Sequence, residues 1–373
     1  MDYSYSKSKN FIIMIFFNYP KEIYKLYKKE INAKILQVLE SGIYVNSKEL
    51  NKFEINFSKY IKTKYSIGVG NATDAIYLSL LSLNIKKGDE VITVSHTATG
   101  TVAAISNLGA KPIFLDIDIN NFNMDLNLLE KKINYKTKAI VIVHLYGQSC
   151  DMKKLMSIAK KNNIPVIEDC SQATGASFKN KKLGSYGTLS CFSFFPTKNL
   201  SCIGDGGMIT CNNKAFKKKI DCLREYGWNQ NRNANTIGIN SRLDEIQASI
   251  LNVKLKYLDR DNLERRLIAK YYNLNIKNDK IIKPIENLLS FHVYHLYVIK
   301  IKNRSKFIKE MNKKNIFTGI HYQKAIHHQK LFLSQKNYLP VTDQVVKSIL
   351  SLPIYPGLSR RDLKKIVNVI NDF

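Results

Sequence analysis

The sequence predicts an α/β fold in which a large domain with a mostly parallel central sheet is followed by a smaller C-terminal α/β domain. Short apolar segments alternate with segments of helical periodicity between about residues 66 and 215. Residues 139–143 are apolar throughout, as expected for a strand that is covered on both faces. Beyond this region the alternation fades, which indicates the smaller domain.

The individual elements follow from local periodicity and end signals. Apolar residues recur at helical spacing in residues 21–41, and Gly42 ends that helix. A second helix is expected over residues 48–61. In the alternating region, strands are expected at residues 67–70, 90–94, 111–116, 139–143 and 165–169, and helices at residues 73–83, 101–108 and 155–162.

The C-terminal part has longer helical segments. A long helix is expected from residue 241 to 257, continuing towards residue 272, and a strand over residues 293–301. Shorter helices are expected at residues 306–313 and 360–370. We therefore place a large domain at 14–255, a small domain at 256–373, and an N-terminal extension at 1–13, because Met14 could be the start of the chain.

The charge is high for an ordinary composition. Apolar residues make up 45% of the chain and charged residues 24%, but 58 Lys and Arg face 30 Asp and Glu, giving a net charge of +28. A protein with such a charge could bind nucleic acid or an anionic membrane surface. The lysines are scattered along the sequence rather than clustered in one stripe. This favours a general bias in amino-acid composition over a binding surface, so we expect no nucleic-acid partner. The apolar run at residues 11–17 is too short for a membrane span.

The six cysteines carry no metal-binding pattern. None forms a C-x-x-C pair, so the sequence predicts no metal site. They lie in apolar segments, which is typical of buried, reduced thiols and indicates a cytoplasmic protein.

Three constellations carry candidate chemistry. Residues 70–75 join a strand to a helix, where free N–H groups and the Thr73 hydroxyl could bind a phosphate, although an ordinary capped turn has the same residues. Asp169 ends an apolar strand and could keep a ring nitrogen protonated, or could cap a helix. Lys198 follows another apolar strand, where desolvation would lower its pKa and prepare it to form a Schiff base.

In this order the motifs resemble the DegT/DnrJ/EryC1/StrS family of pyridoxal-phosphate (PLP) dependent sugar aminotransferases. The resemblance extends over residues 14–373 and is carried by residues 71–75, 168–172, 194–200 and 238–245. It implies the fold-type I aminotransferase architecture, with PLP and its amino form, pyridoxamine phosphate, as the cofactor. It also implies a homodimer in which each site is built from both subunits.

The resemblance assigns expected roles to individual residues. Lys198 would bind the cofactor covalently and move protons, Asp169 would pair with the ring nitrogen, and Gln172 would contact the ring hydroxyl. The remaining expected contacts are Thr73, Asp74 and Ser193 to the cofactor phosphate, Asn240 to the phosphate of the partner's cofactor, and Tyr186, His321 and Tyr322 to the sugar.

One loop departs from the family pattern. Ala98 stands where the family usually has an aromatic residue that stacks on the cofactor ring. His96 is then expected to take that place, with a simple loop histidine as the alternative.

The implied reaction transfers an amino group from glutamate to a keto-deoxysugar attached to a nucleotide. Residues 146–148, 196–200 and 240–245 are most similar to the branch that converts dTDP-3-keto-6-deoxyhexose to the 3-amino-3,6-dideoxyhexose. A 4-keto sugar nucleotide is the alternative substrate. Two further alternatives are a regulatory or nucleic-acid-binding protein on the same scaffold and a dehydratase, but the intact Lys198 favours transamination.

Overall fold

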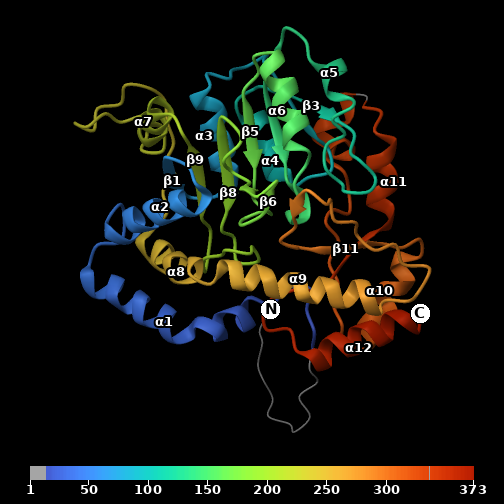
Figure 1. Cartoon of the computed structure of the whole chain (residues 1–373). Coiled ribbons are helices and arrows are strands. Elements are labelled where there is room, and N and C mark those ends of the chain that lie inside the picture. Colours follow the sequence, from blue (N-terminus) through green and yellow to red (C-terminus); the bar gives the residue numbers. More distant parts are fainter. Residues whose placement is uncertain (1–13, 336) are drawn as a thin grey trace.

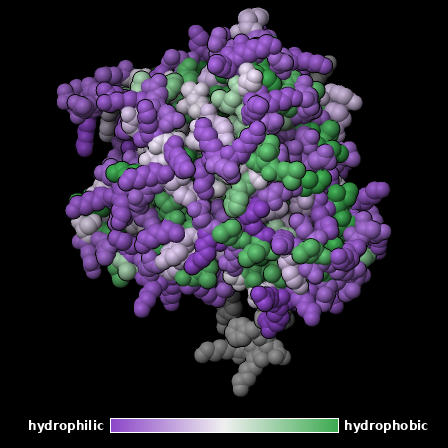
Figure 2. All heavy atoms as spheres, in the orientation of Figure 1, coloured by the Kyte–Doolittle hydropathy of each residue, from purple (hydrophilic) through white to green (hydrophobic). Residues whose placement is uncertain are grey.

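A computed structural model describes residues 14–335 and 337–373 of the chain (Figure 1). The expected N-terminal extension at residues 1–13 lies outside the described residues. Among the described helices, none is long and apolar enough to cross a membrane. Hydrophilic side chains cover most of the face shown in Figure 2, and hydrophobic side chains gather in smaller patches among them.

The large domain is built on a seven-stranded sheet with the strand order β1-β9-β8-β5-β4-β2-β3. Strand β9 runs antiparallel to both of its neighbours, and the other neighbouring pairs are parallel, which confirms the mostly parallel sheet. The strands are β1 (Tyr65–Val69), β2 (Glu90–Val94), β3 (Lys111–Leu115), β4 (Thr137–Val143), β5 (Val166–Asp169), β8 (Leu189–Ser193) and β9 (Gly207–Cys211).

Helices cover both faces of this sheet, and the residues of β4 show how. Ile140 and Ile142 pack into one core cluster with side chains of α2, α6 and α8, whereas Ala139 and Val141 pack into another with side chains of α3, α4 and α7. Because side chains alternate across the strand, each residue from 139 to 143 packs into one of the two cores, which explains the apolar run. The helices are α2 (Lys48–Ile61), α3 (Ala72–Ser82), α4 (Thr99–Asn107), α6 (Met152–Lys161), α7 (Lys214–Leu223) and α8 (Glu245–Leu255).

The second core combines the C-terminal elements with the beginning of the described chain. Ile15 pairs with Ile316, and Ile23 and Tyr27 of α1 are buried in the same cluster as α9, β11, β12 and α12. Strands β11 and β12 form an antiparallel pair. The elements here are α1 (Pro20–Ser41), α9 (Leu258–Asn275), β11 (Tyr297–Lys300), α10 (Arg304–Lys313), α11 (Pro340–Ser348), β12 (Ile349–Leu352) and α12 (Arg360–Asn371).

The smaller elements connect these parts. A three-stranded sheet has the order β10-β6-β7. The remaining elements are α5 (Leu129–Lys132), β6 (Ser177–Phe178), β7 (Lys181–Lys182), β10 (Ser290–Phe291) and the 3₁₀ turns η1 (Leu145–Gly147), η2 (Ile326–His328) and η3 (Lys330–Gln335).

Two expected elements differ from the structure. The long helix over 241–272 is wrong: α8 begins at Glu245 and ends at Leu255, and α9 is a separate helix. Residues 241–244 are not helical, because the Ser241 N–H is donated to the Arg224 carbonyl oxygen and its side chain accepts from the Gly70 N–H. The strand expected over 293–301 is confined to β11, because the Val293 N–H bonds the Gly147 carbonyl oxygen instead of a strand.

Candidate active site

A cavity of about 520 Å³ opens where β4, β5 and β8 end at Val143, Asp169 and Ser193. Ligands of α/β sheets bind at this carboxyl edge. Six of the residues expected in the site line this one cavity: Thr73, Asp74, Asp169, Gln172, Ser193 and Lys198.

The N-terminus of α3 forms one wall of the cavity. Ala72 and Thr73 are the first helical residues, so their N–H groups have no partner within the helix and can bind an anion. Gly100 lies opposite, and a Cβ atom there would stand 2.6 Å from the Thr73 Oγ1 atom. Glycine at this position therefore leaves room for the Thr73 hydroxyl in the cavity.

Asp74 lines the same wall, but its polar groups are already used. Its carboxylate accepts from the Ser241 hydroxyl (2.6 Å) and from the Asn71 amide (3.0 Å), and its N–H is donated to the Asn71 side chain (2.9 Å). An ionised carboxylate cannot donate to a phosphate. The structure thus places Asp74 as a link between Ser241 and the start of α3 rather than as a phosphate donor.

Asp169 is buried at the end of β5 and is firmly oriented. Its Oδ2 atom accepts from the Thr101 hydroxyl at 2.8 Å, and its Oδ1 atom accepts from the Ser171 N–H at 3.1 Å. Thr101 lies on α4, and the sequence reasoning missed its role because it reads only as a helix residue. The carboxylate can still accept a further hydrogen bond from a ring N–H in the cavity.

Lys198 has the lowered pKa that its position in the sequence predicts. Burial lowers the pKa of its ammonium group to about 8, although the charge of Asp169 opposes this shift. A large fraction of this amine is therefore neutral and nucleophilic near pH 8, unlike that of an exposed lysine.

The loop that carries Lys198 is held from both sides. The Asn199 amide donates to the Asn262 side chain (2.7 Å) and to the Val293 carbonyl oxygen (3.1 Å), and buried Lys254 donates to the Ser201 carbonyl oxygen (2.6 Å). These contacts connect the loop to α8 and α9, so the lysine is fixed by residues far away in the sequence.

Gln172 and Tyr322 connect the two parts of the molecule at the cavity. The Gln172 amide donates to the Tyr322 hydroxyl at 2.9 Å and accepts from the Tyr146 N–H at 2.7 Å. One amide N–H of Gln172 is left for a ligand. Tyr146 is a residue that the sequence reasoning did not assign, and its φ of 60° marks a tight turn after β4.

The expectation that His96 stacks on a bound ring does not fit its position. Its side chain is fully buried behind the cavity wall, with the Nε2 atom 2.7 Å from the Tyr146 hydroxyl. Burial lowers the pKa of His96 to about 3, so the ring is neutral. Thr97 and Ala98 line the cavity in its place. Successive side chains of the β2–α4 loop point in different directions. The order of residues in the sequence does not predict which of them faces the cavity.

The other expected contacts lie around the cavity rather than in its lining. Tyr186 is half-buried, and its hydroxyl donates to the Phe178 carbonyl oxygen at 2.5 Å. The His321 Nδ1 atom is 2.9 Å from the Ser351 hydroxyl, and burial, aided by the charge of Lys198, lowers its pKa to about 4. Asn240 is exposed.

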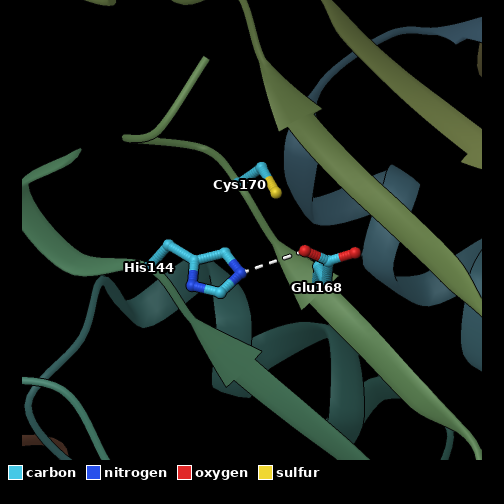
Figure 3. Close-up of side chains that lie close together, drawn as sticks. All are labelled: His144, Glu168 and Cys170. Atoms are coloured by element: carbon cyan, nitrogen blue, oxygen red, sulfur yellow. Dashed lines mark hydrogen bonds and ion pairs between the residues drawn. The ribbon is translucent and has the colours of Figure 1, made fainter. Parts of the chain in front are cut away.

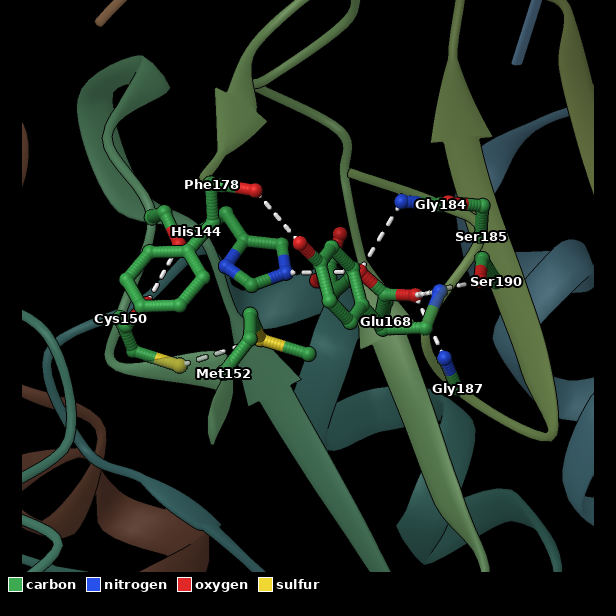
Figure 4. Close-up of polar contacts among 12 residues, drawn as sticks. His144, Cys150, Met152, Glu168, Phe178, Gly184, Ser185, Gly187 and Ser190 are labelled. Carbon is green, nitrogen blue, oxygen red and sulfur yellow. Dashed lines mark hydrogen bonds and ion pairs between the residues drawn. The ribbon is translucent and has the colours of Figure 1, made fainter. Parts of the chain in front are cut away.

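A buried carboxylate next to Asp169 organises the sheet below the cavity. Glu168 points to the opposite side of β5 from Asp169, and His144 of the β4 end lies 3.2 Å from its Oε2 atom (Figure 3). The N–H groups of Gly184 and Gly187 also donate to this carboxylate at 2.9 and 2.7 Å (Figure 4). The Tyr186 N–H donates to it at 2.7 Å.

These hydrogen bonds decide what Glu168 can do. Burial alone would raise the pKa of Glu168, but the bonds from His144, Gly184 and Gly187 lower it overall, so the group is ionised. The Ser190 hydroxyl, at 3.1 Å, completes the set of donors. The Glu168 carboxylate is therefore surrounded by protein donors and holds the turn that carries Tyr186.

The donors of the cavity fit pyridoxal phosphate. The α3 N-terminus and the Thr73 and Ser193 hydroxyls suit the phosphate, Asp169 suits a protonated ring nitrogen, and Lys198 suits the aldehyde. The space left by Gly100 in front of Thr73 supports the same fit.

The chain is similar to known proteins over nearly its whole length. The model of the DegT/DnrJ/EryC1/StrS aminotransferase family matches residues 25–371. A dTDP-3-amino-3,6-dideoxy-alpha-D-galactopyranose transaminase from Aneurinibacillus thermoaerophilus is 44% identical over 95% of this chain and 98% of its own length. The structure of DesV from S. venezuelae aligns with a TM-score of 0.93 at 33% identity, covering 96% of this chain and 98% of that chain. NtdA from Bacillus subtilis with bound cofactor PMP aligns with a TM-score of 0.89 at 28% identity, covering 98% of this chain and 86% of that chain.

Proposed function

Because the chain belongs to the DegT/DnrJ/EryC1/StrS aminotransferase family, we propose that it transfers the amino group of glutamate to a dTDP-linked 3-keto-6-deoxyhexose. The chain is a PLP-dependent sugar-nucleotide aminotransferase with the fold of that family. The observation that carries the proposal is Lys198, an amine with a lowered pKa in the cavity of Asp169 and the α3 N-terminus.

The position of the keto group is the finer part of the proposal. The relative that is 44% identical is named for a 3-amino-3,6-dideoxy sugar attached to dTDP, which supports a 3-keto acceptor. In the net reaction the sugar carbonyl becomes an amine and glutamate becomes 2-oxoglutarate. A 4-keto sugar nucleotide stays the alternative acceptor.

We assign the chemical roles from the contacts in the cavity. The bound cofactor supplies a ring that withdraws electrons from the carbon next to the transferred nitrogen. The Asp169 carboxylate, oriented by Thr101, holds the proton on the ring nitrogen. The Lys198 Nζ atom would take a proton from the donor carbon and deliver it to the carbon on the other side of the transferred nitrogen, because its lowered pKa lets it act as base and acid near neutral pH.

The sugar is proposed to lie on the side of the cavity formed by Gln172 and Tyr322. Burial raises the pKa of Tyr322, so its hydroxyl stays protonated and can donate to a sugar oxygen. His321 precedes it in the chain, and Tyr186 stands on the turn fixed by Glu168. These three side chains are the proposed sugar contacts.

We propose a homodimer for the same site. Large apolar side chains are exposed near the end of α1, at Leu36, Leu39, Ile43 and Tyr44, and in the lining of the cavity, at Phe195. Exposed Asn240 would then reach the cofactor phosphate of the partner subunit. Sedimentation of the purified chain should give twice the mass of 42.8 kDa.

The pH dependence of cofactor capture tests the state of Lys198. Only the neutral amine attacks an aldehyde, so the capture rate should rise about tenfold per pH unit below pH 8 and level off above it. Stopped-flow absorbance after mixing cofactor-free protein with pyridoxal phosphate measures this rate. A rate that still rises steeply at pH 10, where exposed lysines titrate, would contradict the lowered pKa.

The reaction itself is tested with defined acceptors. We expect the purified protein, glutamate and dTDP-3-keto-6-deoxyhexose to give an amino sugar nucleotide and equal amounts of 2-oxoglutarate, measured by mass spectrometry. The 4-keto isomer serves as the comparison and should react at least tenfold more slowly. Faster reaction of the 4-keto isomer would overturn the proposed acceptor, and no 2-oxoglutarate with either acceptor would overturn glutamate transfer.

A further inference from the structure

We propose that His327, His328 and Asp343 form a zinc-binding site on the C-terminal lobe, separate from the cavity. One ligand atom of each residue lies within 4.8 Å of the others, and no residue of this group lines the cavity. The two histidines are adjacent in η2, and Asp343 is in the first turn of α11.

His327 is oriented as a metal ligand is. Its Nδ1 atom lies 2.7 Å from the Ser95 hydroxyl, which also accepts from the His327 N–H at 3.0 Å. Its side chain is 3% exposed, and its Nε2 atom faces the Asp343 carboxylate. When Nδ1 donates to Ser95, the lone pair of Nε2 points at the site, which is the second-shell arrangement of metal-bound histidines.

The other two ligands complete a site that opens to solvent. The Asp343 Oδ1 atom lies 3.0 Å from His327 Nε2 and 2.6 Å from His328 Nε2. Ligand atoms around tetrahedral zinc stand about 3.3 Å apart, from metal–ligand distances of about 2.0 Å. The short pair needs to open by less than 1 Å, and His328 and Asp343, with 45% and 35% of their side chains exposed, are free to move. Water would take the fourth position.

The ligand set favours zinc over calcium or magnesium. Two imidazoles and one carboxylate suit a borderline metal, whereas Ca²⁺ and Mg²⁺ prefer oxygen ligands. Lys302 and Lys347 line the surface depression beside Asp343. Their positive charges would oppose the purely electrostatic attraction of a metal cation to this carboxylate. Coordination of zinc by the two histidine nitrogen atoms does not depend on that electrostatic attraction.

Bound zinc would fasten α11 to the loop after β2. The Ile326 N–H donates to the Ser95 carbonyl oxygen at 3.0 Å, next to the hydroxyl that holds His327. Thr97 and Ala98, two and three residues after Ser95, line the cavity. The metal would therefore stabilise the contact between the C-terminal lobe and one wall of the active site.

The test is zinc binding by the PLP-loaded protein, measured by isothermal titration with Zn²⁺ in a non-chelating buffer. We expect one zinc per chain, a rise in melting temperature on binding, and affinity at least tenfold lower in His328→Gln and Asp343→Asn. Both residues are partly exposed, so these variants should fold. Cys222→Ser, which changes the half-buried thiol outside the group, should bind like the native protein.

Two results would overturn the proposal. One is the absence of saturable binding to the native protein. The other is binding that persists undiminished in both His328→Gln and Asp343→Asn, or that is lost in Cys222→Ser, since zinc would then lie elsewhere. The binding measurement does not depend on the sugar acceptor, so its outcome is independent of the proposed function.

Discussion

Lys198→Ala is expected to abolish covalent cofactor binding and to reduce amino transfer by at least about 10²–10⁴-fold. The variant loses both the nucleophile that captures the aldehyde and the base that moves the proton. The buried Asp169 carboxylate loses a neighbouring cation in this variant but keeps its hydrogen bonds from Thr101 and Ser171, so we expect the variant to fold. An absorbance spectrum with pyridoxal phosphate, before and after glutamate, should show a visible band that glutamate removes in the native protein and no such band in the variant.

Lys254 offers a matched control for this experiment. It is also buried, and burial lowers its pKa to about 8, but it donates to Ser201 and does not line the cavity. Lys254→Met should keep the visible band, with reduced stability as its main effect. A band that persists in Lys198→Ala, or that disappears only in Lys254→Met, would mean that another amine binds the cofactor.

The sequence was sufficient to predict those site residues whose chemistry depends on the residue type at the end of a strand. Lys198 and Asp169 each follow an apolar strand, so the rule that ligands bind at the carboxyl edge of the sheet located both of them. The side chains that orient them were harder to find. Thr101 and Asn262 act through contacts between elements, and neither residue type nor spacing indicates such a contact in advance.

Loop conformation explains where the positions of side chains differ from those expected for the site. His96 and Ala98 are two positions apart, yet one is buried behind the wall and the other lines the cavity. The family resemblance implied that Asp74 contacts the phosphate, but its carboxylate accepts from Ser241, a residue 167 positions away. The contacts of Ser241 also explain why residues 241–244 lie outside α8, although their periodicity predicted a helix.

Asp169→Asn is expected to lower turnover by about 10²–10⁴-fold while leaving the fold intact. The asparagine side chain has the same shape: its one oxygen can still accept from the Ser171 N–H, and its amide nitrogen can donate to the Thr101 hydroxyl in place of the bond that the carboxylate accepts. It is neutral, however, and cannot keep a ring nitrogen protonated, so the ring withdraws electrons less strongly. Cofactor should still bind through Lys198, and single-turnover absorbance with glutamate should show a slow reaction of the bound cofactor.

Asp205→Asn is the matched control for charge, because Asp205 also lines the cavity but is exposed and lies outside β5. It should change turnover only a few-fold. If both variants slow the reaction equally, the general negative charge of the cavity matters rather than the contact at the ring nitrogen. If Asp169→Asn reacts at the native rate with full cofactor occupancy, the carboxylate that Thr101 orients has no part in proton retention, and the role assigned to Asp169 is wrong.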